Sequence, residues 1–127
     1  MAAETLVVDD IEYGRLIVEA LDSADVPVSA AFWLLYGDTG TWKLWIATPE
    51  AGHDLQAAYV EIAKVLSSSG APLIDFDLGR IRLVRSDEPM VRSLRKVVKV
   101  DGVGKVRFSS NVIDGTYIED AIIYRLT

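Results

Sequence analysis

The sequence contains no cysteine and only one histidine, His53. The missing thiols exclude disulfide bonds, thiol catalysis and cysteine-ligated zinc, and a reducing cytoplasm is the default setting for such a chain. Its longest apolar run, residues 30–36, is far below the roughly 20 residues that span a bilayer. The first residues lack the basic start of a secretory signal. These absences predict a soluble cytoplasmic protein, and we expect no cofactor and no membrane partner.

Length and composition indicate one globular domain covering residues 1–127. Half of the 127 residues are hydrophobic and a quarter are charged, which is enough to build a sizeable core and argues against disorder. The net charge is -6, so the molecule as a whole should repel nucleic acid and anionic lipid.

The charges are distributed unevenly along the chain. The segment from residue 80 to residue 107 holds three acidic residues (Asp87, Glu88, Asp101) and nine basic ones: Arg80, Arg82, Arg85, Arg92, Arg95, Lys96, Lys99, Lys105 and Arg107. The segment is therefore at +6, which leaves -12 on the remainder. A basic surface on an acidic protein is the expected result.

The stretch from Ala30 to Thr48 is predicted to form a central β-hairpin, because two aromatic-rich runs flank a glycine-bounded turn. A three-residue loop, Asp38-Thr39-Gly40, with Gly40 in the left-handed region fixes the register. It places on one apolar core face the pairs Tyr36 with Trp42, Leu34 with Leu44 and Phe32 with Ile46. A two-residue turn would shift one strand by one residue and exchange its faces.

The second face of this hairpin then carries Trp33 opposite Trp45 and Leu35 opposite Lys43. Two interpretations follow. Large aromatic side chains are mostly buried, which favours a hairpin covered on both sides. The sharper alternative is an exposed apolar patch that binds a partner.

The other elements are read from periodicity and end signals. Helices are expected from Asp9 or Asp10 to Ala24, from His53 or Asp54 to Ser68, and from Ser86 to Val98. Further strands are expected at 79–84, 105–109 and 117–126, with a bulge at Gly115. The order α-β-β-α-β-α-β-β predicts an α+β fold with a mainly antiparallel five-stranded sheet and its three helices on one side.

Three features of the sequence are weak signals of catalysis, metal binding or phosphate binding. His53 lies at a predicted helix start with no nucleophile motif to accompany it. Metal binding would require the carboxylates Asp75, Asp77, Glu119 and Asp120 to converge, and Glu119 can instead pair with Arg107 or Lys105. The run from Gly102 to Lys105 lacks the spacing of a phosphate loop. No catalytic or metal-ligating residue is predicted.

The strongest constellation combines cations and aromatics on the outer sheet face. If the strands pair as predicted, this face holds Arg80, Arg82, Lys105, Arg107 and Arg125 beside Lys43, Trp33 and Trp45. Such a face suits single-stranded nucleic acid, since bases stack while cations neutralise phosphates. A solvated face, or one that meets the acidic side of another copy, is the competing interpretation, and the net charge favours it.

The leading hypothesis is a small non-enzymatic interaction or regulatory module that forms a homodimer through the apolar face of Trp33, Leu35, Lys43 and Trp45. An acidic inhibitor of a basic partner protein belongs to the same class. Two alternatives stay open: a polyanion or single-stranded nucleic-acid binder using Arg80, Arg82, Lys105 and Arg107, and, ranked last, a carboxylate-metal enzyme.

Overall fold

The computed structural model describes residue 6 and residues 8–35 and 40–127. These residues form three α-helices and one five-stranded sheet, so the predicted α+β class and element order are confirmed. The elements are α1 (Val8–Ser23), β1 (Ala30–Leu35), β2 (Trp42–Ala47), α2 (Leu55–Ser68), β3 (Ile81–Val84), α3 (Pro89–Arg95), β4 (Val106–Ile113) and β5 (Thr116–Leu126).

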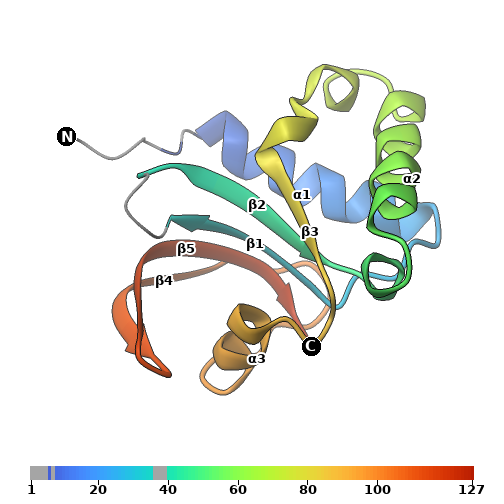
Figure 1. Ribbon diagram of the computed structural model, residues 1–127. Helices are drawn as coiled ribbons and strands as arrows, with labels where there is room; N and C mark the ends of the chain where they lie inside the picture. The colour runs from blue at the N-terminus through green and yellow to red at the C-terminus, as the bar shows by residue number, and fades with distance from the viewer. Residues whose placement is uncertain (1–5, 7, 36–39) are drawn as a thin grey trace.

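The sheet has the strand order β3-β2-β1-β5-β4, which puts β3 and β4 at its two edges (Figure 1). Strands β1, β2, β4 and β5 pair antiparallel, as expected. Strand β3 instead runs parallel to β2, so the sheet is mixed. The cause is the connection through α2, since a helical crossover returns the chain in the same direction.

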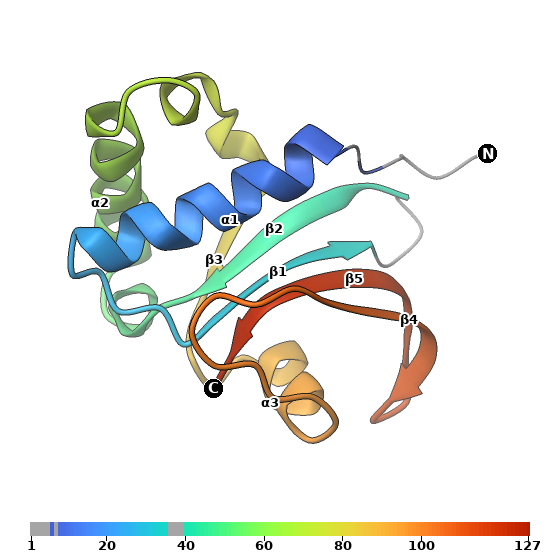
Figure 2. The same ribbon diagram turned by 180° about the vertical axis from the view of Figure 1, so that it is seen from behind.

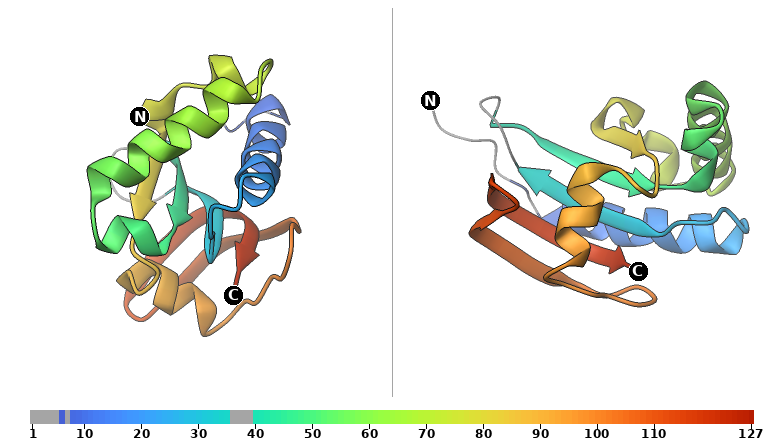
Figure 3. Two further views of the ribbon diagram at one scale, coloured as in Figure 1. Left: turned by 90° about the vertical axis from the view of Figure 1, so that its right-hand side faces the viewer. Right: turned by 60° about the horizontal axis from the view of Figure 1, so that its bottom comes forward.

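Helices cover both faces of the sheet, not the single face that was expected. The first core lies under α1 and α2 and contains Ile17, Trp33 and Ile62, whereas the second lies under α3 and contains Phe32, Trp45 and Leu94. Turning the molecule around brings α1 to the front of the sheet (Figure 2), and the side views show α3 on the opposite side from α1 and α2 (Figure 3). The central strand β1 is therefore buried along its whole length.

The central hairpin forms with a register that differs by one residue from the prediction. Trp33 lies opposite Leu44 and Phe32 opposite Trp45. Asp38 and Thr39 of the predicted loop lie outside the described residues, while Gly40 has the expected positive φ of 65°. Leu35 pairs with Trp42, so the segment that connects β1 to β2 has an even number of residues. Relative to the predicted register, the side chains of one strand therefore lie on the opposite face of the sheet.

Strands β4 and β5 are joined by the two-residue turn Asp114-Gly115, whose φ values of 49° and 80° fit a type I′ turn. The hairpin itself is confirmed, but the bulge expected at Gly115 is wrong. The register change lies near the end of β5, where Arg125 pairs with Ala31 and Ile123 pairs with Phe32. One extra residue there places Ile123 and Leu126, which are three residues apart, in the same second core.

The far half of the β4–β5 hairpin bends towards α3 (Figure 1). Ser110 has a φ of 52°, and it is the one position of β4 at which the pairing with β5 is interrupted. Beyond the bend, Ile113 and Ile118 enter the second core, and the Asp114 carboxylate accepts hydrogen bonds from Ser93 at 2.8 Å and Lys96 at 3.1 Å. The hairpin tip thereby closes the part of this core that the short α3 leaves open.

The helix ends follow the sequence with small corrections. Asp54 caps α2 as predicted by accepting a bond from the Ala57 amide. Helix α3 is capped by Glu88 and is shorter than expected, since it ends at Arg95. Leu55, the first residue of α2, is 48% exposed. Within the described residues, no helix has the length and apolar character to cross a membrane.

Candidate functional site

The two tryptophans proposed as one binding face lie on opposite faces of the sheet. Trp33 is fully buried beneath α1, and its Nε1 donates to the Asp10 carbonyl at 3.1 Å. The Arg80 guanidinium lies 4.7 Å from the centre of the Trp33 ring and forms a 2.6 Å ion pair with Asp10. This cluster fastens the start of α1 to the segment before β3, and it leaves no indole surface for a ligand.

Trp45, Lys43 and Arg82 do share a face, the one covered by α3. The Trp45 ring stacks on Phe32 with centroids 5.8 Å apart, and the Arg82 guanidinium lies 4.5 Å from the ring centre on the outside. Trp45 is 3% exposed, while both cations are exposed. Lys43 Nζ donates to the Gly79 carbonyl at 2.7 Å. The structure thus brings together three of the predicted site residues.

The remaining predicted residues are separate from these three. Leu35 is buried in the first core. Lys105 is exposed just before β4, and Arg107 pairs with Asp120 on the neighbouring strand, not with Glu119. The predicted aromatic platform for nucleic-acid bases is therefore not assembled, because both indoles are buried and the cations are divided between the two faces.

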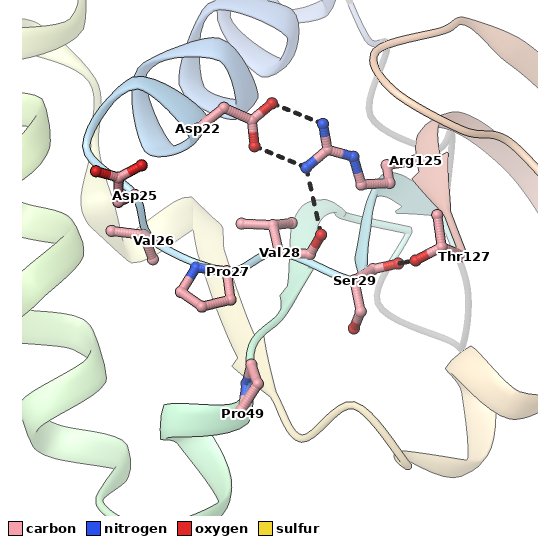
Figure 4. Close-up of a pocket in the computed structure, with 9 residues that line it drawn as sticks. All are labelled: Asp22, Asp25, Val26, Pro27, Val28, Ser29, Pro49, Arg125 and Thr127. Atoms are coloured by element: carbon pink, nitrogen blue, oxygen red, sulfur yellow. Dashed lines mark hydrogen bonds and ion pairs between the residues drawn. The ribbon is translucent and has the colours of Figure 1, made fainter.

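A surface hollow of about 460 Å³ lies beyond the end of α1 (Figure 4). It is lined by Asp22, Asp25, Val26, Pro27, Val28, Ser29, Pro49, Arg125 and Thr127. Its most obvious ligand-binding group is the guanidinium of Arg125, which reaches the hollow from the end of β5.

Arg125 is already occupied by protein groups. Its two terminal nitrogens donate to the Asp22 carboxylate at 2.8 and 2.6 Å, one of them also approaches the Val28 carbonyl, and Nε donates to the Gly102 carbonyl at 2.7 Å. The hydrogen bonds from Arg125 hold the pKa of Asp22 below its ordinary value. The Arg125 guanidinium links α1 to β5 within the fold, and we therefore assign no ligand to the hollow.

The histidine and the carboxylates that were candidates for catalysis or metal binding do not form one site among the described residues. His53 is exposed after a short 3-10 helix, Pro49–Gly52. Asp77 accepts a bond from the Gly79 amide, and Asp120 pairs with Arg107. Across the described residues, no group of three or more histidine or carboxylate side chains is placed to hold a metal ion. Tyr124 has a raised pKa because it is buried, and its hydroxyl donates to the Ile11 carbonyl at 2.5 Å.

The edge of the sheet at β3 is closed by a side chain. Tyr59 of α2 places its hydroxyl against the strand, where it accepts a bond from the Leu83 amide at 3.0 Å and donates to the Ile81 carbonyl at 3.4 Å. These backbone groups face away from β2 and would otherwise meet an added strand. This role has no local sequence signal, because it depends on the parallel pairing of β3 with β2, whereas the sequence pattern predicts a mainly antiparallel sheet.

The opposite edge, at β4, is open. Six of its eight residues are exposed, and among the described strands β4 pairs only with β5. In an antiparallel pair joined by a two-residue turn, every second residue of a strand points its amide and carbonyl towards the partner strand, and the residues in between point theirs outward. By this alternation the amides and carbonyls of Val106, Phe108 and Val112 point away from β5. The Val112 amide donates a hydrogen bond to Asn111 Oδ1 at 3.0 Å. The other outward groups face solvent.

A scan of protein-family models finds none that matches this chain, and searches of curated proteins and of solved structures find no match either.

Proposed function

We propose that the protein is a non-enzymatic interaction module that forms a homodimer by pairing β4 with β4 of a second copy. The observation that carries this proposal is the open eight-residue edge. An exposed edge strand is a template for another strand, because its unpaired amides and carbonyls can continue the sheet. This surface replaces the Trp33 and Trp45 face, which is buried.

The sequence of β4 suits pairing with itself. Antiparallel pairing about a two-fold axis at Ser109 places Val106 opposite Val112 and Arg107 opposite Asn111 of the second copy. The exposed valines then form apolar cross-strand contacts, and no like charges lie directly opposite each other. Arg107 is the only charged residue of the strand, and Asp120 neutralises it within each copy.

The bend at Ser110 interrupts the shared ladder between its two Val106–Val112 contacts, so we expect a weak and reversible dimer. Two copies with a net charge of -6 each repel at long range. Added salt screens this repulsion and should strengthen the dimer. Binding of a polyanion to the basic segment would respond in the opposite way, since salt weakens contacts to phosphate.

Sedimentation velocity over a concentration series tests the proposal. Val112→Lys, at a 61% exposed edge position, should shift the equilibrium towards monomer, because it puts a strongly hydrated charge at the apolar contact. The matched control is Val60→Lys on α2, where an exposed valine gains the same charge far along the chain from the edge. It should leave the association unchanged.

Val106→Pro tests the backbone directly, because it removes an outward amide without removing a bond to β5. Hydrogen exchange should show the Val106 and Phe108 amides protected at high protein concentration and unprotected at low concentration. A monomer at every accessible concentration, or equal effects of Val112→Lys and Val60→Lys, would refute the proposed dimer.

A further inference from the structure

Arg82 differs from most other arginines of the chain in having no acidic partner among the described residues. Five arginines form ion pairs, and Arg95 donates to backbone carbonyls; the ion pairs join Arg15 to Glu12 and Glu19, Arg80 to Asp10, Arg85 to Asp87, Arg107 to Asp120 and Arg125 to Asp22. Among the described residues, Arg82 and Arg92 are the two arginines for which no ion pair to an acidic side chain and no hydrogen bond is found.

The orientation of Arg82 is set by the rings beneath it. Phe32, Trp45 and the guanidinium form a layered stack whose lower two members are buried. Stacking on an indole face holds a guanidinium through its attraction to the ring electrons. One face of the planar Arg82 guanidinium is thus covered by the Trp45 ring. The edge of the guanidinium carries the N–H donors and remains available to a ligand.

Lys43 adds a second cation on the same face. It is two residues before Trp45 on β2, and Trp45 pairs with Arg82 across the parallel β2–β3 ladder. The bond from Lys43 Nζ to the Gly79 carbonyl holds the ammonium beside the start of β3, and an ammonium has further donors. A planar donor fork and a point charge therefore lie on one small part of the surface.

We propose that Arg82 and Lys43 bind a single carboxylate group presented by a partner polypeptide. A guanidinium edge offers two parallel N–H donors that match the two oxygens of a carboxylate. The net charge of -6 repels anions in proportion to their charge, so among anionic ligands it opposes one with a single negative charge least. The carboxylate can come from an acidic side chain or from a chain terminus. The proposal does not depend on the pairing of β4.

Nuclear magnetic resonance of the arginine Nε–Hε and tryptophan Nε1–Hε1 groups provides the test. The probes are N-acetyl-glutamate N-methylamide for the side-chain carboxylate, N-acetyl-glycine for the terminal one, and N-acetyl-glutamine N-methylamide as the neutral analogue. The Arg82 and Trp45 signals should shift and saturate with one or both acids, with weak, millimolar-range affinity, and the neutral analogue should give no saturable shift. The acid that binds more tightly identifies the source of the carboxylate.

Arg92 supplies the matched control. It is exposed and has no ion pair within the described part of the chain, but it is not stacked on a ring. Arg82→Gln should abolish the saturable shift, Arg82→Lys should weaken binding several-fold because the planar fork is lost, and Arg92→Gln should have no effect. Linear shifts of equal size at Arg82 and Arg92, or saturation that survives Arg82→Gln, would overturn the proposed site.

Discussion

The two edges of the sheet satisfy their backbone groups in different ways. At β3, a side-chain hydroxyl from α2 takes the place of a neighbouring strand. At β4, which is twice as long, Asn111 has the one described side chain that hydrogen-bonds an outward backbone group, and most of the strand is exposed to water. The fold therefore completes one edge internally and leaves the other available for association.

Burial explains why the edges differ. Ile81 and Leu83 are 5% and 4% exposed because α2 packs beside them, so the amide and carbonyl between them have little access to water. A buried polar group without a partner costs free energy, and Tyr59 removes that cost. The backbone of β4 is hydrated, so its outward groups need no protein partner in the monomer. They can exchange water for another strand without loss of the native fold.

Of the substitutions that test this difference between the two edges, Tyr59→Phe is expected to change the free energy of unfolding most. The ring remains in place, but the Leu83 amide and the Ile81 carbonyl lose their partner at a site with little access to water. We expect the free energy of unfolding to fall by about 1–3 kcal/mol, the usual cost of leaving a buried donor unsatisfied. Urea denaturation followed by tryptophan fluorescence measures this change.

Tyr117→Phe is the control for that substitution. Tyr117 is 55% exposed on β5, and no described group receives a hydrogen bond from its hydroxyl. Its loss should change the free energy of unfolding by less than about 0.5 kcal/mol, as surface substitutions usually do. Equal effects of the two substitutions would show that the hydroxyl of Tyr59 does not seal the β3 edge.

A smaller effect is expected from Ser110→Gly at the bend of the open edge. Ser110 has a φ of 52°, a region that glycine enters without the steric cost paid by other residues. The substitution should raise the free energy of unfolding by up to about 1 kcal/mol, since part of the gain is lost to the greater freedom of glycine in the unfolded chain. Thermal and urea denaturation together measure it.

The neighbouring Ser109 is the matched control, because it is also exposed but pairs normally with Asp120. Ser109→Gly should lower stability by about 0.5–1 kcal/mol, the usual cost of glycine within a regular element. If Ser110→Gly lowers stability as Ser109→Gly does, the bend at Ser110 is not strained.

Local sequence signals predicted most of the helices and strands, but not which face of the sheet each strand side chain occupies. Hydrophobic period and end signals located α1, α2 and β5 to within a residue or two, because those signals are contained in each segment. The face of Trp33 depends on whether the connection to β2 has an odd or an even number of residues, and a change of one reverses it. That reversal separated the two indoles of the expected binding face.

Long-range geometry accounts for the other differences. The direction of β3 follows from where α2 leads the chain, and the role of Tyr59 follows from that direction. Neither can be inferred from spacing along α2 alone. Alternation did place Lys43 and Trp45 on one face of β2, and the parallel pairing of β3 with β2 brings Arg82, also predicted on that face, next to Trp45.

The smallest expected effect concerns the tip of the open hairpin and depends on pH. Hydrogen bonds from Ser93 and then Lys96 hold the pKa of Asp114 below its ordinary value of 3.8. The folded state therefore favours the ionised carboxylate, and the contact between the tip and α3 is complete above that ordinary value. It is lost as the pH falls through the lowered pKa of the folded state. Acid should loosen the tip before it unfolds the sheet.

The methyl resonances of Ile113 and Ile118 report this loosening, since both side chains lie in the second core beside the tip. Acid titration of the folded protein should shift them at a pH below 3.8, while the methyl groups of Ile17 in the first core remain unchanged. Asp114→Asn keeps an acceptor for Ser93 but cannot titrate, so it should remove the shift. A shift that persists in Asp114→Asn would assign the acid response to another carboxylate and leave the tip held by its apolar contacts alone.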